Sequence, residues 1–480
     1  MKKIKEIFKA PKLLFRASVF SIFYYFFQLL FLVVLLSFSV GVVAGLASGS
    51  FLLDKNYDNF RDRSNPSLVY FDLKNTKYSK QDAKHPIFDG AEGFKDYLVL
   101  PPSKVDPKKA TGIDSIVDHI STYFNKQLNQ DLKTSNNQYF HIMFRDTRIL
   151  EDQSISKTFK VVNYDSDHNN TDKILIEQGR GPQDNHEIMV SSIFAQRNNV
   201  NVGEYYVIFG QSYKVVGIAN SWDFTYPLIN NFNVVTDNTN NGIIYAYKTA
   251  FYQLDNSKFR QPQFITLSST DREIYLIGGV DQKYRSANNF PEIEKDITTI
   301  LKNFTASKVF NDSPLLQSWF DGYKKYDANN DSAGYYYYRT HLTTKAITYI
   351  QLFTIIFSVF ILFITLFIFY NLYKRRFKLE KYNIKVFCFL GYSRQEIKNG
   401  YLSWTYIIFI LSAFLIIFIS VFCQWVLLRL FNNFFTIPII VNFLPLLITF
   451  VIVFLIVFSF IVAFSNGFVG FEIAKILEPE

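Results

Sequence analysis

The chain has 480 residues, 49% of them hydrophobic, and its formal net charge of +9 raises the question of a nucleic-acid partner. The position of the charge excludes one: residues 1–16 carry net +5 and residues 374–398 net +6, whereas residues 54–345 hold 34 basic and 35 acidic side chains. Because a charge in the middle of a bilayer is costly, long stretches without any charge indicate membrane spans. Four such stretches are present, at residues 17–53, 346–373, 399–428 and 430–471.

One span, a long gap and three closely spaced spans predict a membrane part of four helices with a large inserted domain. About 20 apolar residues cross a bilayer as a helix, and every stretch exceeds this length. Short basic loops stay on the cytoplasmic side, so we expect a multi-pass cell-membrane protein with both termini in the cytoplasm and the insert outside. The expected boundaries are a cytoplasmic amphipathic helix at 1–16, spans at 17–53, 346–373, 399–428 and 441–466, the external domain at 54–345, a cytoplasmic loop at 374–398 and a cytoplasmic tail at 467–480.

The first predicted elements are a surface helix and a closely packed span. Apolar residues between lysines in residues 1–16 are typical of a short helix that lies on the inner membrane face. In the first span, Ser37, Gly41, Gly45 and Gly49 recur every four residues. Small residues at this spacing let two helices approach closely in lipid, so we interpret them as a packing face, expected to join a second copy of the chain. The alternative is that these glycines are incidental in an apolar helix.

The insert is predicted to be a mixed α+β domain. Apolar residues at helical spacing predict helices at 112–133 and 291–304, and a further helix is expected at 314–323. Gly210-Gln211-Ser212 separates two strand-like segments and predicts a hairpin. The expected strands are 139–145, 157–163, 172–178, 187–191, 205–209, 213–218, 242–247, 264–268 and 273–278. Both cysteines, Cys388 and Cys423, lie outside the insert, so it depends on its apolar core and not on disulfides.

No set of residues in the sequence predicts catalysis. A phosphate-binding loop of the Gly-x-x-x-x-Gly-Lys-Ser/Thr type is missing, so no ATP hydrolysis is expected in this chain. The six histidines show no metal-ligand spacing, and neither a nucleophile elbow nor a charge within the spans indicates a hydrolase or an ion-coupled carrier. We therefore predict a non-enzymatic membrane protein with no catalytic residue, no metal and no cofactor.

The loop at 374–398 has the most specific local pattern. A basic helix is expected up to Leu390, with Arg376 and Glu380 paired four residues apart. A glycine that tolerates the left-handed conformation and a Ser–Glu capping box then predict a sharp turn and a new helix. A simple basic tether does not need such a break, so we interpret the loop as a docking element for a cytoplasmic partner. Its candidate residues are Glu380, Phe387, Leu390, Gly391, Ser393, Arg394 and Glu396.

The same loop is similar to that of a known family. It reads Arg375-Arg376, Leu379-Glu380, Val386-Phe387 and then Leu390-Gly391-Tyr392-Ser393-Arg394-Gln395-Glu396-Ile397. This order resembles the loop between spans two and three of FtsX-like permeases of the MacB/LolE class of ABC transporters. Parts of the insert also resemble the external domain of that family, namely Gly179-Arg180, Glu187-Ile188, Val202-Gly203-Glu204 and Val215-Val216-Gly217-Ile218.

The resemblance implies a permease subunit that dimerises, contacts membrane lipids and binds a separate cytoplasmic ABC ATPase through residues 374–398. ATPase-driven motion would pass to the external domain, which would export or extract a peptide, lipid or lipoprotein without a central pore. Two alternatives stay open: a multi-span surface receptor or adhesin, although a simple anchor needs one span, and an FtsX-like regulator of an external hydrolase, although the insert is large for that role.

Overall fold

The computed structural model divides the chain into two compact units. Unit 1 comprises Met1–Lys55, Ala346–Phe431 and Ile439–Glu480, and unit 2 comprises Asn56–Lys345 and Asn432–Pro438. The residues described are 26–72, 140–164, 171–208, 210–229, 236–247, 250–251, 272–285, 290–305, 324–325 and 338–477. The short segment 432–438 therefore belongs with the insert, although the sequence predicts it to lie between two spans.

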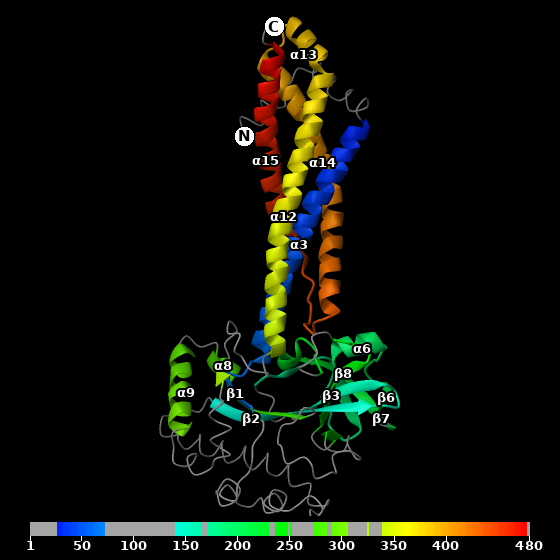
Figure 1. The fold of residues 1–480 in the computed structure, drawn as a ribbon, viewed down its shortest axis with the longest axis vertical. Coiled ribbons are helices and arrows are strands. Elements are labelled where there is room, and N and C mark those ends of the chain that lie inside the picture. Colours follow the sequence, from blue (N-terminus) through cyan, green and yellow to red (C-terminus); the bar gives the residue numbers. More distant parts are fainter. Residues whose placement is uncertain are drawn as a thin grey trace, which may run out of the picture. The chain divides into compact units, whose positions relative to one another are not determined.

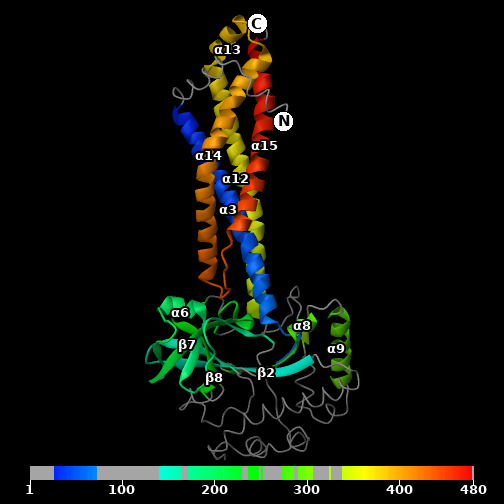
Figure 2. The ribbon, with the colours of Figure 1, turned by 180° about the vertical axis from the view of Figure 1, so that it is seen from behind.

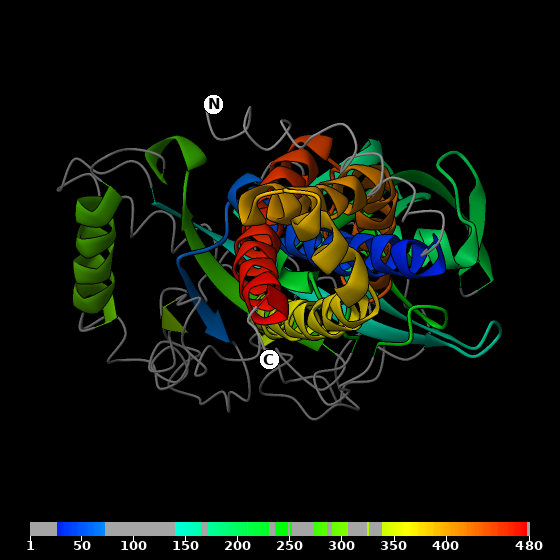
Figure 3. The same cartoon turned by 90° about the horizontal axis from the view of Figure 1, so that it is seen from above.

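Unit 1 is built from long helices. The helices that contribute to it are α3 (Phe26–Ser64), α12 (Tyr338–Leu379), the short α13 (Lys381–Phe389), α14 (Arg394–Asn432) and α15 (Phe443–Leu477). An apolar segment in a membrane must satisfy its backbone polar groups internally, which favours helices over these stretches. Among the described residues, four helices are long and apolar enough to cross a membrane. Figures 1 and 2 show them side by side, and Figure 3 views them end-on.

The helices extend beyond the charge-free stretches. α3 ends at Ser64, where Asn65 has a φ of 49° and Pro66 follows, a combination that stops a helix. α15 continues to Leu477, over residues that the sequence assigns to the cytoplasmic tail. Charged residues at a helix end keep the backbone hydrogen bonds of the helix, so these two helices continue past the last charge-free residue.

Unit 2 is centred on a mixed sheet with ten strands in the described residues. The strands are β1 (Val69–Asp72), β2 (Phe140–Asp152), β3 (Lys157–Tyr164), β4 (Ile174–Gly179), β5 (Glu187–Val190), β6 (Tyr205–Ile208), β7 (Gln211–Ser221), β8 (Asn241–Tyr247), β9 (Arg272–Val280) and β10 (Lys324–Lys325). Their order is β10-β1-β9-β2-β3-β8-β5-β7-β4, with β6 paired to β7. The pairs β3–β8 and β5–β7 are parallel, and the others are antiparallel. The predicted fold class, an all-α membrane part of four helices with an α+β domain between the first two, is confirmed.

The strands follow the sequence prediction most closely where the pattern is local. β6 and β7 form the predicted hairpin, with Ile208 opposite Gln211 and a φ of 74° at Gly210. β2 differs, because it continues to Asp152 where the prediction ends at residue 145. Its second half contains charged side chains that are buried against distant partners, as with Arg148, whose guanidinium lies 4.5 Å from the ring centroid of Phe251. Such a segment looks like a loop in the sequence alone.

Apolar side chains cover both faces of the sheet around β3. Phe159 belongs to one buried cluster and Val162 to the other, since successive residues of a strand point to opposite faces. Helix α6 (Ser192–Asn198) covers the first face. The 3-10 turn η5 (Trp222–Phe224), directly after β7, contributes Phe224 to the second face.

The remaining helices of unit 2 are short. α8 spans Gln282–Arg285, and α9 spans Phe290–Thr305, with Ile293 and Ile297 buried. α9 confirms the helix predicted at 291–304. The predicted helices at 1–16, 112–133 and 314–323 and the strand at 264–268 lie outside the described residues.

Candidate functional site

The loop between α12 and α14 forms a helix–turn–helix within unit 1 (Figure 1). α12 ends at Leu379, and Glu380 has a φ of −96° and a ψ of 10°, so α13 starts as a separate helix at Lys381. The sequence predicts one continuous helix here, and the break at Glu380 corrects that prediction. The buried side chain of Ile384 belongs to the same apolar cluster as residues of α15, on which α13 packs.

Arg376 holds the end of α12 against α14. Its guanidinium lies 4.2 Å from the ring centroid of Trp404 and 5.3 Å from that of Tyr401, both on α14. Its Nε donates to Glu380 Oε1 at 3.0 Å, which is the i,i+4 pair predicted from the sequence, and both side chains are buried. Separating the two partners of a buried ion pair leaves an uncompensated charge, which is strongly unfavourable. The Arg376 and Glu380 side chains are therefore expected to stay in contact. Glu380, the residue between α12 and α13, is thus held to the end of α12 by this pair.

The turn after α13 has the predicted geometry. Gly391 has a φ of 88°, and the amide of Tyr392 donates to the carbonyl of Phe387 at 3.2 Å. The Ser393 amide donates to the Glu396 carboxylate at 2.8 Å, and the Glu396 amide donates to the Ser393 hydroxyl at 3.3 Å. The capping box is thus confirmed, and α14 starts at Arg394 directly after it.

Large apolar side chains are exposed on α13 and at its end. Phe389 is 91% exposed, Leu390 65% and Tyr382 77%. Tyr382 and Phe389 are seven residues apart, which places them on the same side of the helix. We call these three residues the α13 face. Exposed apolar surface beside polar residues is typical of a contact site for another protein.

The structure separates two residues that the sequence prediction groups together. Leu390 is exposed, but Phe387 is partly buried and packs edge-to-face on Tyr392, with ring centroids 6.0 Å apart. Phe389 and Tyr382, both exposed, are not among the residues that the loop pattern predicts. Their spacing of seven residues is the signal that could have identified them.

The glycines of α3 lie against α14 of the same chain. A Cβ added to Gly45 would be 2.5 Å from the Ser420 carbonyl oxygen, and a Cβ added to Gly41 would be 2.7 Å from the Ile419 side chain. Gly49 makes a similarly close approach to α14, at 2.8 Å from the side chain of Leu427. This contact corrects the expectation that the face joins a second copy of the chain, because α14 already occupies it.

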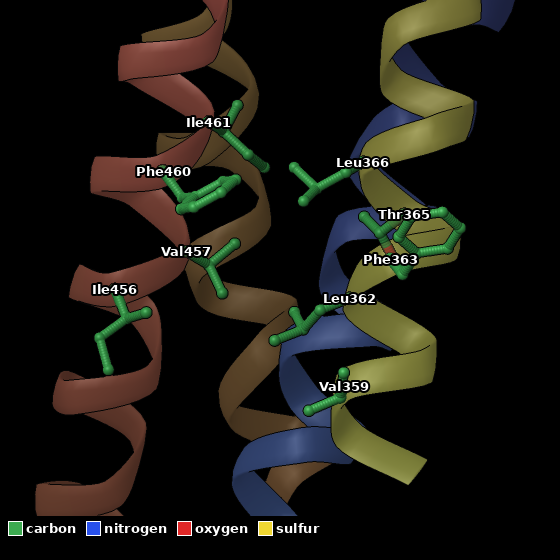
Figure 4. Close-up of a pocket in the computed structure, with 9 residues that line it drawn as sticks. All are labelled: Val359, Leu362, Phe363, Thr365, Leu366, Ile456, Val457, Phe460 and Ile461. Atoms are coloured by element: carbon green, nitrogen blue, oxygen red, sulfur yellow. The ribbon is translucent and has the colours of Figure 1, made fainter. Parts of the chain in front are cut away.

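A cavity of about 290 Å³ lies between α12 and α15 (Figure 4). Its lining consists of Val359, Leu362, Phe363, Thr365, Leu366, Ile456, Val457, Phe460 and Ile461. Thr365 supplies the only hydroxyl, and its Oγ1 is hydrogen-bonded to Ser39 Oγ at 2.6 Å. The lining therefore offers no charged group to a ligand. Within the described part of the chain, no cluster of three or more His, Cys, Asp or Glu side chains could hold a metal ion.

Comparison with known families identifies the helical part of the chain. Residues 355–473 match the family model described as FtsX-like permease C-terminal, and this segment contains α13, α14 and most of α12 and α15. A search of curated protein sequences gave no match. The resemblance to FtsX-like permeases is thus confirmed, while the MacB/LolE class stays a prediction. The chain is therefore a membrane protein in which residues 355–473 match the FtsX-like permease C-terminal family.

Proposed function

We propose that this chain is the permease subunit of an ABC transporter and that it transmits ATPase-driven motion to its inserted domain. The transporter exports or extracts a peptide, lipid or lipoprotein. A separate cytoplasmic subunit hydrolyses ATP, since this sequence carries no phosphate-binding loop. The family match supports the proposal, because it includes the whole loop between α12 and α14.

The α13 face is the observation that carries this proposal. Its apolar side chains lie on a short helix that is held at one end by Arg376 and Glu380 and at the other by the turn at Gly391. A helix that is already ordered loses little conformational entropy on binding, which favours affinity. In this proposal Phe389, Leu390 and Tyr382 contact the ATPase. Of the other predicted coupling residues, Ser393 and Glu396 form the capping box at the turn, and Arg394 is the first residue of α14.

The proposed topology follows the charge distribution. The basic segments at 1–16 and 374–398 face the cytoplasm together with both termini, and residues 54–345 lie outside the cell membrane. A second permease, either an identical copy or a paralogue, completes a dimer, and membrane lipids surround the spans. Because α14 covers the glycines of α3, the dimer contact uses another surface.

Purification in mild detergent tests the ATPase association. We expect a P-loop ATPase to co-purify with the wild-type protein. In Phe389→Asp the recovered ATPase should fall by about tenfold or more, because a carboxylate buried in an apolar contact is strongly unfavourable. Phe389→Leu is the matched control, since it keeps an apolar side chain at the same position and should retain the ATPase.

Two results would contradict the proposal. If Phe389→Asp retained the ATPase, the α13 face would not be the site that binds the ATPase. Repeated purification of the wild-type protein without any P-loop ATPase would contradict the proposal that the chain is a transporter subunit. It would favour a receptor or adhesin.

A further inference from the structure

One turn of unit 2 is in contact with three segments that continue into membrane helices. We call residues 222–228 the junction turn; it follows β7 and starts with η5. It is part of the core of unit 2, because Trp222, Asp223, Phe224 and Leu228 are all buried. Asp223 pairs with Arg145 of β2, and Phe224 packs in the apolar cluster on one face of the sheet. The junction turn therefore moves with the sheet.

The first segment is the end of α3. The Trp222 ring lies against the rings of Tyr57 and Phe60, with centroids 5.0 Å and 6.0 Å apart. The Tyr57 hydroxyl is also within 2.6 Å of Thr344 Oγ1 near the start of α12. The ends of the two helices are thus connected to each other as well as to the turn.

The second segment is the start of α12. Arg339 Nε donates to the Leu228 carbonyl at 3.1 Å, and the guanidinium lies 4.9 Å from the ring centroid of Phe224. One turn further along the helix, Thr343 Oγ1 is 3.0 Å from Thr225 Oγ1. Arg339 is fully buried, so these contacts are made without competition from water.

An ionic contact connects the start of α12 to two strands as well. The Glu273 carboxylate of β9 accepts from Lys160 of β3 at 2.7 Å and lies 3.4 Å from the Arg339 guanidinium. All three side chains are buried. The start of α12 is therefore fixed to the middle of the sheet and to the junction turn together.

The third segment is the connection between α14 and α15. Thr436 Oγ1 donates to the Phe224 carbonyl at 2.7 Å, and the Thr436 amide donates to the Thr225 carbonyl at 2.8 Å. The rings of Phe435 and Tyr226 are 5.2 Å apart. Chain connectivity requires that α3 and α12 meet the insert, but it does not require residues 432–438 to do so.

We infer that the junction turn is a coupling element that passes displacements of α3, α12 and the α14–α15 connection to the sheet as one movement. This inference rests on the proposed function, since it names the residues through which motion of the membrane helices would reach the insert. Thr225 is central to it, because its side chain bonds α12 and its carbonyl bonds residue 436.

Hydrogen exchange on the purified full chain in nanodiscs tests the junction without an ATPase. Thr436→Val removes one hydroxyl, and we expect amides in 222–228 and in the first turns of α12 to exchange about tenfold faster, together with those of 432–438. Thr343→Val should act reciprocally and accelerate the amides of 432–438. Thr299→Val is the matched control, because its hydroxyl bonds only its own helix, to the Lys295 carbonyl at 2.9 Å.

Acceleration confined to the segment that carries the substitution would overturn the inference. An equal acceleration across unit 2, with α9 included, would also overturn it, since it would report general loosening of the fold. Both threonine-to-valine variants preserve side-chain volume closely, so neither opens a cavity in the core.

A second measurement separates the junction from the proposed function. With the co-purified ATPase and a non-hydrolysable ATP analogue, we expect exchange in 222–228 to change in the wild-type protein and at least about half of that change to be lost in Thr436→Val. If the two threonine variants act reciprocally but nucleotide changes nothing in unit 2, then ATPase-driven transmission is wrong and the mechanical junction remains. If nucleotide alters exchange in unit 2 equally in wild type and Thr436→Val, the junction turn is not the route.

Discussion

At the scale of single residues, Lys160 is a buried cation surrounded by charges from three elements. Glu273 of β9, Arg339 of α12 and Asp223 of the junction turn all act on it. Burial lowers the pKa of Lys160 to about 7, and the Arg339 guanidinium adds to this effect, although Glu273 and Asp223 oppose it. The amine thus changes charge near neutral pH, whereas in the unfolded chain it stays protonated up to about pH 10.

This lowered pKa predicts a pH dependence of stability. Below about pH 7 Lys160 is protonated in both states, so it adds no pH dependence to the free energy of unfolding. Between about pH 7 and pH 10 the unfolded state binds the extra proton, so stability rises with pH, by at most about 1.4 kcal/mol per unit. Thermal unfolding of the wild-type protein and Lys160→Met between pH 6 and pH 9 measures the difference. Parallel pH profiles for the two proteins would contradict this assignment.

At the scale of elements, the close packing of α3 on α14 depends on the absence of side chains at the glycines. In Gly45→Leu the new side chain would overlap with the Ser420 carbonyl, a backbone atom that cannot move away without shifting α14. Overpacking of this kind costs about 1–3 kcal/mol, so we expect a lower unfolding temperature. Gly467→Leu on α15 is the matched control, since an added Cβ there meets nothing within 4 Å.

The two interpretations of the glycine face make different predictions. If α14 is the partner of this face, Gly45→Leu lowers the thermal stability of the single chain. Cross-linking between copies then falls only as far as the loss of stability explains. A variant with wild-type thermal stability and weakened self-association would instead restore the dimer interpretation. Thermal unfolding and cysteine cross-linking along α3 measure the two quantities separately.

How far the sequence predicts each element depends on whether its determinants are local. The capping box of Ser393 and Glu396 and the hairpin at Gly210 were predictable, because neighbouring residues determine both. The second half of β2 was not, since the burial of Arg148 depends on Phe251, far along the chain. In the candidate site, the turn at Gly391 could be predicted, but the exposure of Phe389 depends on how α13 packs against α15. The junction turn was missed for the same reason, although a run of aromatic residues after a strand was visible in the sequence.

At the scale of the whole molecule, the proposed topology predicts which residues can be reached from each side of the membrane. In a Cys388→Ser, Cys423→Ser background, a single cysteine at Asn383→Cys should react with an impermeant maleimide in inverted vesicles and not in intact cells. Thr299→Cys should show the opposite pattern. Both native residues are exposed, so a lack of labelling on one side reports the membrane barrier and not burial. Labelling of Asn383→Cys from outside would reverse the orientation.

The contact of Thr436 with the junction turn also determines the order in which the protein can mature. Translation delivers the N-terminal part first, and domains generally fold as they emerge. Unit 2, however, takes residues 432–438 from a segment made after α14. Before residue 436 has been synthesised, the Phe224 carbonyl has no hydrogen bond from the Thr436 hydroxyl, and the Tyr226 ring has no contact with the Phe435 ring. Completion of the inserted domain is thus a late event in biosynthesis, and a chain terminated within α14 would leave this surface uncovered for quality-control proteases to recognise.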